Sequence, residues 1–212
     1  MSDTSELTLY YAPRTRAFTA LWLLEELGLP YRLESFDIQT GRHKEPDYLA
    51  LNPMGKIPLV LDRGVPVSEL GAIAIYLSDR FPAANLGAAL DAPERAAFLR
   101  WVFFSSAIME PALGEKFFKW QIPARAVAWG SFDQMLGVLT GALERNTYLL
   151  GERFSAADIL VGSTARFGQM FGVLPKEGVL GEYTARLSER EAFKRATAIE
   201  MREDARFPLA RS

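Results

Sequence analysis

The segment YYAPRTRAF, residues 10–18, stands where an apolar strand is expected to end and a helix to begin. It gathers the hydroxyl and guanidinium groups of Tyr10, Tyr11, Arg14, Thr15 and Arg16. A helix start favours bound anions, because its first N–H groups lack intrahelical partners and its dipole is positive there. The cluster is therefore either part of a reactive site or a solvated turn at the edge of a sheet.

The segment MGKIPLV, residues 54–60, places Pro58 directly before a predicted strand. A proline cannot donate a ladder hydrogen bond, so it requires an edge position or a special backbone geometry. A cis Ile57–Pro58 bond would turn the backbone of Ile57 outwards, where it could pair with an extended peptide ligand. A trans proline that starts an edge strand is the alternative.

Glu69 lies just inside the helix predicted after that strand. The helix dipole stabilises a carboxylate in a first turn, and this alone would account for the residue. The same carboxylate could instead face a ligand amine, while free N–H groups of the turn hold a ligand carboxylate.

A cationic group, Arg42, His43, Lys44 and Lys56, flanks the YLALNP segment and could be a solvated loop. His43 is the only histidine, so a cluster of histidine ligands is excluded and we predict no metal site.

The elements that must position these residues follow from hydrophobic periodicity. Residues 7–11 and 31–38 are predicted strands, and apolar spacing from Thr15 predicts a helix that Gly28 ends. The strand–helix–strand order implies a parallel strand pair.

A hairpin and a helix complete this predicted α/β domain. The strands are residues 57–61 and 65–67, the tight turn between them is 62–64, and the helix is 68–81 with Ser68 as its N-cap.

The remainder of the chain is predicted to be helical. Its helices are residues 92–120 with a kink at Pro111, 123–145, 155–171 with capping-box spacing from Ser155 to Asp158, and shorter pieces to about residue 205. We therefore expect an α/β domain over 1–81, a linker rich in small residues over 82–90, and an all-α domain over 91–212.

Composition narrows the class of protein further. The 212 residues are 49% apolar and carry a net charge of -2, which fits a globular chain without a nucleic-acid surface. The chain has no cysteine, which excludes disulfides and a cysteine nucleophile. The opening MSDTSEL does not read as a secretory signal, and no apolar run approaches the roughly 20 residues of a membrane span, so we expect a cytoplasmic protein with no membrane partner.

The chain resembles the soluble glutathione S-transferase superfamily, in a bacterial form with phi-, beta- and nu-like features. The motifs that carry the resemblance are NPMGKIPLVLDRGVPVSELGAIAIYLSDRFP, TGRHKEPDYLALNP and LLGERFSAADI. The resemblance implies a thioredoxin-like N-terminal domain, an all-helical C-terminal domain, glutathione as co-substrate and a homodimer. It also implies that the third motif supports folding and is not catalytic.

By this resemblance, Ile57–Pro58 corresponds to the family's cis-proline, and the backbone of Ile57 pairs with the cysteinyl part of glutathione. Glu69 corresponds to the acid that holds the γ-glutamyl amine. The tripeptide is surrounded by His43, Lys44 and Lys56, with His43 and Lys44 towards its glycine carboxylate. Arg14 is also expected to bind glutathione.

The sequence departs from the family pattern after the acid, where a serine or threonine is usual and Leu70 stands here. Its backbone N–H can still bind the ligand carboxylate. The missing hydroxyl bond to a charged group is worth roughly 1.5–3 kcal/mol, so we expect weaker glutathione binding.

Thiol activation must lower a pKa from about 8.5 to about 6.5, which takes roughly 2.7 kcal/mol. A helix start with one charge-assisted hydrogen bond is about sufficient. Arg16 and the Thr15 hydroxyl are the first candidates, and the role of Thr15 is implied by similarity to phi, theta and zeta members. Tyr10 is the rival by similarity to alpha and pi members. Strand alternation lets at most one of Tyr10 and Tyr11 face the cleft.

The electrophile site is expected along the helix 92–120, at Phe104, Ile108 and Phe117. The predicted function is a glutathione transferase that detoxifies hydrophobic electrophiles or peroxides. Two alternatives stay open: a glutathione-dependent disulfide oxidoreductase that uses no protein thiol, and a non-catalytic binding or assembly module.

Overall fold

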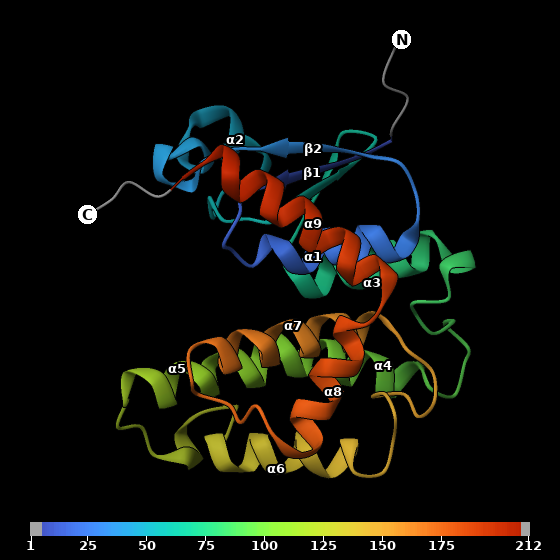
Figure 1. Cartoon of the computed structure of the whole chain (residues 1–212), viewed down its shortest axis with the longest axis vertical. Coiled ribbons are helices and arrows are strands. Elements are labelled where there is room, and N and C mark those ends of the chain that lie inside the picture. The colour runs from blue at the N-terminus through green and yellow to red at the C-terminus, as the bar shows by residue number, and fades with distance from the viewer. Residues whose placement is uncertain (1–5, 209–212) are drawn as a thin grey trace. The chain divides into compact units, whose positions relative to one another are not determined.

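The computed structural model of the chain describes residues 6–208 (Figure 1). Contacts between its segments define two compact units. Among the described residues, one unit contains 6–76 together with 190–208, and the other contains 77–189. The domain boundaries expected at 82–90 stay a prediction.

The first unit is built on a four-stranded mixed sheet. Its strands are β1 (Leu7–Tyr11), β2 (Tyr31–Ser35), β3 (Leu59–Asp62) and β4 (Val65–Ser68), in the order β2-β1-β3-β4. β1 and β2 are parallel, as the strand–helix–strand order predicts. β3 and β4 are the antiparallel arms of the predicted hairpin.

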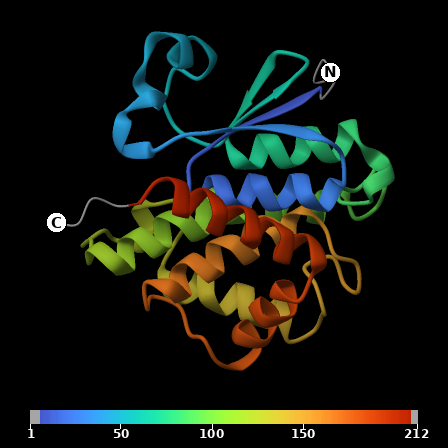
Figure 2. The same cartoon turned by 45° about the horizontal axis from the view of Figure 1, so that its top comes forward.

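Four helices accompany this sheet in the sequence of the first unit. They are α1 (Ala17–Leu27), α2 (Pro46–Leu51), α3 (Leu70–Arg80, which runs into the second unit) and α9 (Glu191–Arg206). The alternate β1 residues Leu7, Leu9 and Tyr11 are buried. α9 lies along α1 (Figure 2), and the rings of Trp22 and Phe193 meet edge to face at 5.0 Å.

Two local features of this unit differ from the sequence analysis. Residues 38–51, for which no helix was predicted, contain the 3-10 turns η1 (Ile38–Thr40) and η2 (Arg42–Lys44) and the helix α2. These elements escape a periodicity search because they are short and Tyr48 is their only buried residue. α3 begins at Leu70, so its N-cap position falls on Glu69 and not on Ser68.

The second unit contains mainly helices. They are η3 (Pro82–Ala84), α4 (Arg95–Phe103), η4 (Phe104–Met109), α5 (Glu110–Phe118), η5 (Ala124–Ala126), α6 (Phe132–Leu143), α7 (Ala156–Met170) and α8 (Gly178–Ser188). The long helix expected over 92–120 is observed over Arg95–Phe118 as α4, the π-helical segment η4 and α5, and the kink at Pro111 stays a prediction. Pro111 has no N–H to donate to the helical hydrogen-bond pattern. In the segment that precedes it, that pattern changes from the α-helical to the π-helical spacing.

The long helix Arg95–Phe118 meets the length and composition of a membrane span, with a mean hydropathy of 1.2 over its most apolar window. No such run was expected from the sequence. The core helix of a soluble protein passes the same test, and 44% of this window is buried within the protein.

The buried Asp158 organises the start of α7. Its carboxylate accepts hydrogen bonds from the N–H groups of Leu149 and Ser155, both at 2.9 Å. It accepts two more from the hydroxyls of Ser155 and Tyr183, both at 3.0 Å. Burial raises the pKa of Asp158, and the four donors stabilise its ionised form. The predicted capping role of Ser155 and Asp158 is thus present, with aspartate in place of the usual glutamate.

Candidate functional site

The sheet register brings three predicted site segments to one edge of the first unit. Tyr10, near the end of β1, pairs with Leu59 at the start of β3. Leu59 in turn pairs with Ser68 at the end of β4. The loop after β1, the Ile57–Pro58 segment before β3 and Glu69 after β4 therefore emerge side by side.

The Ile57–Pro58 peptide bond is cis. The segment before it is held by two side chains of the α2 region. The Tyr48 hydroxyl donates to the carbonyl of Lys56 at 2.6 Å, and the Asn52 amide donates to the same oxygen at 2.8 Å. Both side chains are fully or almost fully buried, so the backbone that enters the cis bond is fixed.

Tyr48 and Asn52 were not among the site residues predicted from the sequence. Their spacing of four residues puts them on one face of a helical turn, and this signal could have identified them.

Glu69 presents an unpaired carboxylate at the same edge. It has a φ of 67°, a region that residues with a side chain seldom adopt. Its side chain is exposed and makes no hydrogen bond or ion pair with any described residue. Leu70 follows as the first residue of α3, where helix geometry leaves the backbone N–H without an intrahelical acceptor. A carboxylate beside a free amide can bind an ammonium and a carboxylate together.

Thr15 stands at the entrance to α1, which begins at Ala17. Its hydroxyl donates to the carbonyl of Ala12 at 2.7 Å and accepts from the N–H of Ala17 at 3.1 Å. Arg16 occupies the N-cap position and makes no side-chain cap. The hydroxyl is thus at the helix start as predicted, and its one proton is directed at the protein backbone.

Arg14 is oriented differently from the other members of the opening cluster. Its guanidinium pairs with Asp204 and donates to the carbonyl of Phe207 at 2.8 Å. Both partners belong to the C-terminal end of α9, which the sequence did not connect with this loop.

Tyr10 and Tyr11 lie on opposite faces of the sheet, as strand alternation predicts. Tyr11 is completely buried with the other alternate β1 residues. Tyr10 is half-buried, and its ring meets that of Tyr48 from α2 edge to face at 5.4 Å. Tyr10 therefore faces α2.

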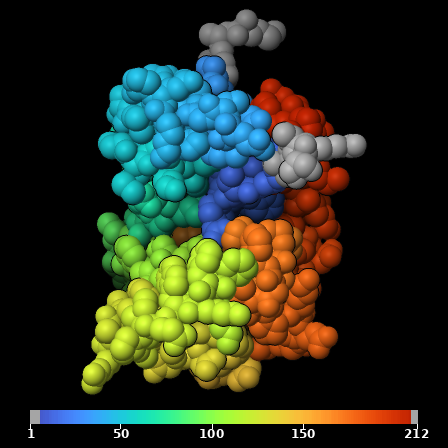
Figure 3. Space-filling model, turned by 90° about the vertical axis from the view of Figure 1, so that its left-hand side faces the viewer, coloured from blue at the N-terminus to red at the C-terminus, as the bar shows by residue number. Residues whose placement is uncertain are grey.

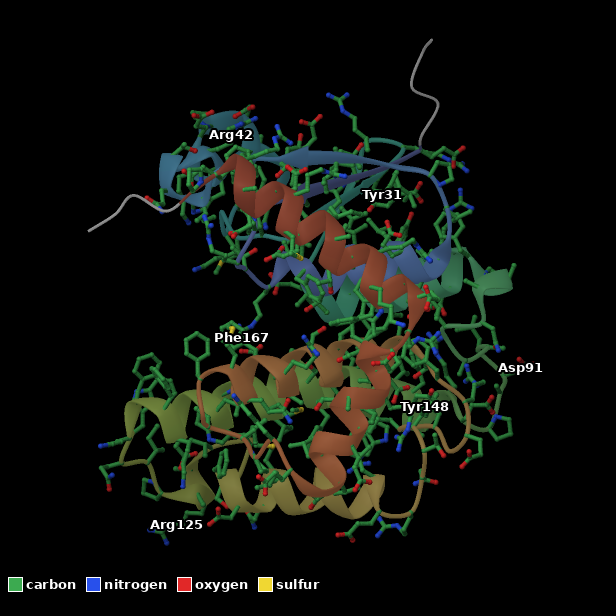
Figure 4. All side chains as sticks on the ribbon, in the orientation of Figure 1. Tyr31, Arg42, Asp91, Arg125, Tyr148 and Phe167 are labelled. Carbon is green, nitrogen blue, oxygen red and sulfur yellow. The ribbon has the colours of Figure 1, made fainter. Side chains whose placement is uncertain are left out.

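The cationic group divides into paired and unpaired members. Arg42 binds both oxygens of Asp47, at 2.7 and 2.6 Å, and is labelled in Figure 4. Lys44 donates to the carbonyl of Met54 at 3.2 Å, whereas Lys56 is exposed and pairs with no described residue. The segment that carries this group lies at the surface of the first unit in Figure 3.

His43 is stacked on Phe36 with a ring separation of 6.4 Å. Burial lowers the pKa of His43, and the neighbouring charges of Lys44 and Lys56 lower it further. Its Nδ1 is buried and has no hydrogen-bond partner among the described residues. The imidazole is therefore neutral at pH 7 and can offer a ligand one N–H donor.

The residues proposed for the electrophile pocket have different environments in the second unit. Phe104 is buried and packs edge to face on Trp101 at 5.0 Å. Ile108 is half-buried in the π-helical segment. Phe117 is 50% exposed and contacts the ring of Phe171 at 5.8 Å. Phe171 also meets the ring of Phe167 in α7 at 4.6 Å, and Phe167 is labelled in Figure 4. Phe117 is therefore the exposed candidate, and it lies beside further aromatic rings.

No group of three or more potential metal ligands occurs in residues 6–208.

The sheet order, the crossover helix and the cis-proline before β3 define a thioredoxin-like unit, and a helical unit follows it in the sequence. The N-terminal domain of the glutathione S-transferase family matches residues 5–79, and its C-terminal domain matches residues 128–191. The chain belongs to this family and is an enzyme of the glutathione transferase type, which confirms the predicted fold class and superfamily.

Individual relatives agree with this assignment. The chain is 31% identical over 166 residues to the disulfide-bond oxidoreductase YfcG of Escherichia coli, which covers 72% of this chain and 76% of the relative. It matches the structure of glutathione transferase URE2P6 from Phanerochaete chrysosporium, a complex with oxidized glutathione. That match has a TM-score of 0.79 at 25% identity and covers 96% and 100% of the two chains.

A third match is a glutathione transferase from Burkholderia graminis, which holds two glutathione molecules per subunit. It has a TM-score of 0.76 at 27% identity and covers 92% of this chain and 89% of the other.

Proposed function

We propose that the chain binds glutathione at the sheet edge and ionises its thiol for attack on an electrophile. One observation carries the proposal. The unpaired carboxylate of Glu69, the fixed backbone at Ile57 and the helix start at Thr15 all emerge from one edge of a single sheet.

Each part of the tripeptide has a complementary group there. Glu69 offers its carboxylate to the γ-glutamyl ammonium, and the N–H of Leu70 offers a donor to the neighbouring carboxylate. The backbone of Ile57 pairs with the cysteinyl residue. Lys44, Lys56 and the N–H of His43 supply the charge and the donor that the glycine carboxylate needs.

Thr15, at the start of α1, is the best candidate to stabilise the thiolate by a hydrogen bond. Its hydroxyl now donates to Ala12 at 2.7 Å, and rotation about the Cβ–Oγ1 bond redirects that proton to a thiolate. A charge-assisted hydrogen bond is roughly twice as strong as the neutral bond that it replaces. Arg16 adds a positive charge one residue away, and Tyr10 is the weaker candidate because its ring packs on Tyr48.

Calorimetric titration with glutathione and with N-acetylated glutathione tests the binding mode. Glutathione should bind, and the acetylated form should bind at least 10-fold more weakly, because it has no ammonium for Glu69. Equal affinity for the two compounds would contradict the assignment of Glu69.

A second activity, reduction of disulfides by two glutathione molecules, is favoured by the similarity to YfcG and by the complex with two glutathiones. The first thiolate attacks one sulfur of the substrate disulfide and expels a substrate thiolate, which takes up a proton. The second glutathione then attacks the mixed disulfide. The products are two substrate thiols and oxidized glutathione, and no protein cysteine is needed.

Turnover assays separate the two activities. Formation of oxidized glutathione with a small dialkyl disulfide, without conjugation of an aryl halide, would favour disulfide reduction. Conjugation of the aryl halide or reduction of an organic peroxide would favour the transferase. Recovery of stable protein partners without either turnover would favour the assembly module.

The proposal extends to the second substrate and the assembly. The electrophile is hydrophobic and contacts Phe117, with Phe104 and Ile108 as tentative further contacts. We also propose a cytoplasmic homodimer with a detoxifying role, and light scattering of the purified protein gives its mass directly.

A further inference from the structure

The loop that carries Thr15 is attached to the last two turns of α9 through Arg14. The backbone N–H of Arg14 donates to Glu200 Oε1 at 2.7 Å. Its guanidinium pairs with Asp204 and donates to the carbonyl of Phe207 at 2.8 Å. Arg14 thus joins the start of the chain to a helix 186 residues further along.

The backbone of Arg14 requires such support. Its φ is 63°, in the left-handed region where the Cβ of an L-residue crowds the following carbonyl. The chain reverses there, so that Thr15 can bond back to Ala12 and forward to Ala17. An acceptor on the N–H of Arg14 stabilises this one conformation and therefore the position of the Thr15 hydroxyl.

The surroundings of Glu200 disfavour its charged form. It is half-buried, and its second oxygen, Oε2, is buried without a hydrogen-bond partner among the described residues. The groups that face it are the N–H of Arg14 and the carboxylate of Asp204. Burial raises the pKa of Glu200, and Asp204 raises it further, while the bond from Arg14 lowers it. Burial of a carboxylate oxygen without a hydrogen-bond partner destabilises the folded chain. Glu200 is therefore not explained by stability, and its bond to the N–H of Arg14 indicates a role in holding the loop.

We propose that Glu200 and Arg14 are positioning residues that hold the Thr15 loop in the geometry that activates the glutathione thiol. The inference rests on the proposed function of Thr15. It also assigns Arg14 to the loop anchor and not to direct binding of glutathione.

The test compares Glu200→Met, which has no acceptor, with Glu200→Gln, which keeps an acceptor for the N–H of Arg14. Glu191→Met removes an exposed carboxylate from the same helix and serves as the control. Three quantities are measured: hydrogen exchange at the Arg14 amide, the thiol pKa of bound glutathione, and the affinity for S-methylglutathione, which has no thiol.

We expect Glu200→Met to raise exchange at Arg14 at least 10-fold and to raise the bound thiol pKa by about one unit. Affinity for S-methylglutathione should stay within twofold, because the binding groups are elsewhere on the edge. Glu200→Gln and Glu191→Met should behave like the natural chain. If Glu200→Met does not fold, Asp204→Asn should give a smaller change in the same direction, because it weakens the guanidinium contact of Arg14 but leaves the acceptor on the Arg14 N–H in place. It also removes a negative charge that faces Glu200, so its effect is read against that of Glu200→Gln.

Faster exchange at Arg14 with an unchanged thiol pKa would overturn the positioning role, and so would exchange that does not change. A bound thiol that is not acidified in the natural chain would instead overturn the proposed function, and the positioning role with it. In that case the exchange data would still report the contact itself.

Discussion

Two acidic residues, Asp158 in the second unit and Glu69 in the first, have opposite surroundings. Asp158 is completely buried and accepts four hydrogen bonds from its own chain. Glu69 is exposed and pairs with no described residue, in a backbone conformation that is unfavourable for its type. Glu69 directly follows Ser68, Asp158 stands three residues after Ser155, and both acids lie near a helix start, so the local sequence alone does not separate their roles. The difference shows that a carboxylate satisfied by its own chain serves the fold, whereas one left unpaired at a converging edge is available to a ligand.

Asp158→Ala should produce the largest effect. The substitution leaves the buried donors of Leu149, Ser155 and Tyr183 without an acceptor, so the free energy of unfolding should fall by about 3–5 kcal/mol. Urea denaturation measures the change. Asp133→Ala removes an exposed carboxylate from the first turn of α6 and should cost less than about 1 kcal/mol. Equal losses in the two variants would contradict the structural role of Asp158.

Glu69→Gln should have the converse effect. Glutathione affinity should fall roughly 5- to 30-fold, because a charge-assisted bond to the ammonium becomes a neutral one worth about 1–2 kcal/mol less. The denaturation midpoint should not change, since the carboxylate supports no contact in the described chain. A large loss of stability with unchanged affinity would reverse the comparison between the two acids.

Leu70→Ser should strengthen binding by a smaller factor. The added hydroxyl can donate to the ligand carboxylate, and a bond to a charged group is worth roughly 1.5 kcal/mol at the lower end, or about 10-fold in affinity. Calorimetry with glutathione measures the gain. Leu70→Ala lacks the hydroxyl and serves as the control, and a similar gain there would indicate relief of a steric contact instead.

His43 should produce the smallest effect, through pH. Its pKa is lowered in the folded chain, so the unfolded chain binds the proton first as the pH falls through about 6.5. The free energy of unfolding should therefore decrease between pH 7.5 and 5.5, and His43→Gln should remove that component. Because His43 is the only histidine, its NMR titration is unambiguous, and bound glutathione should raise its pKa if the glycine carboxylate lies beside it.

Much of the first unit could be predicted, because β1, α1 and the β3–β4 hairpin carry clear periodicity and turn residues. The convergence of Ile57–Pro58, Glu69 and Thr15 follows from that topology once the strands are ordered. The lack of a partner for the Glu69 carboxylate among the described residues could not be predicted. It depends on the start of α3 at Leu70, one residue later than an N-cap at Ser68 would give.

Contacts distant in sequence were beyond prediction. Nothing in the pattern around Arg14 identifies Glu200 or Asp204 as its partners, because an arginine at a turn is satisfied equally well by water. The π-helical segment at 104–109 also gives no local signal apart from Pro111, and it changes the spacing that related Phe104 to Ile108.

Activation of the glutathione thiol is tested by ultraviolet difference titration of bound glutathione against pH, with the natural chain compared with Thr15→Ala, Arg16→Ala and Tyr10→Phe. We expect a thiolate signal near neutral pH in the natural chain. The thiol pKa should be higher by about one unit in Thr15→Ala, or roughly 1.4 kcal/mol, with a smaller rise in Arg16→Ala and none in Tyr10→Phe. Glutathione that binds without forming a thiolate, or a thiolate that only Tyr10→Phe removes, would contradict activation by Thr15.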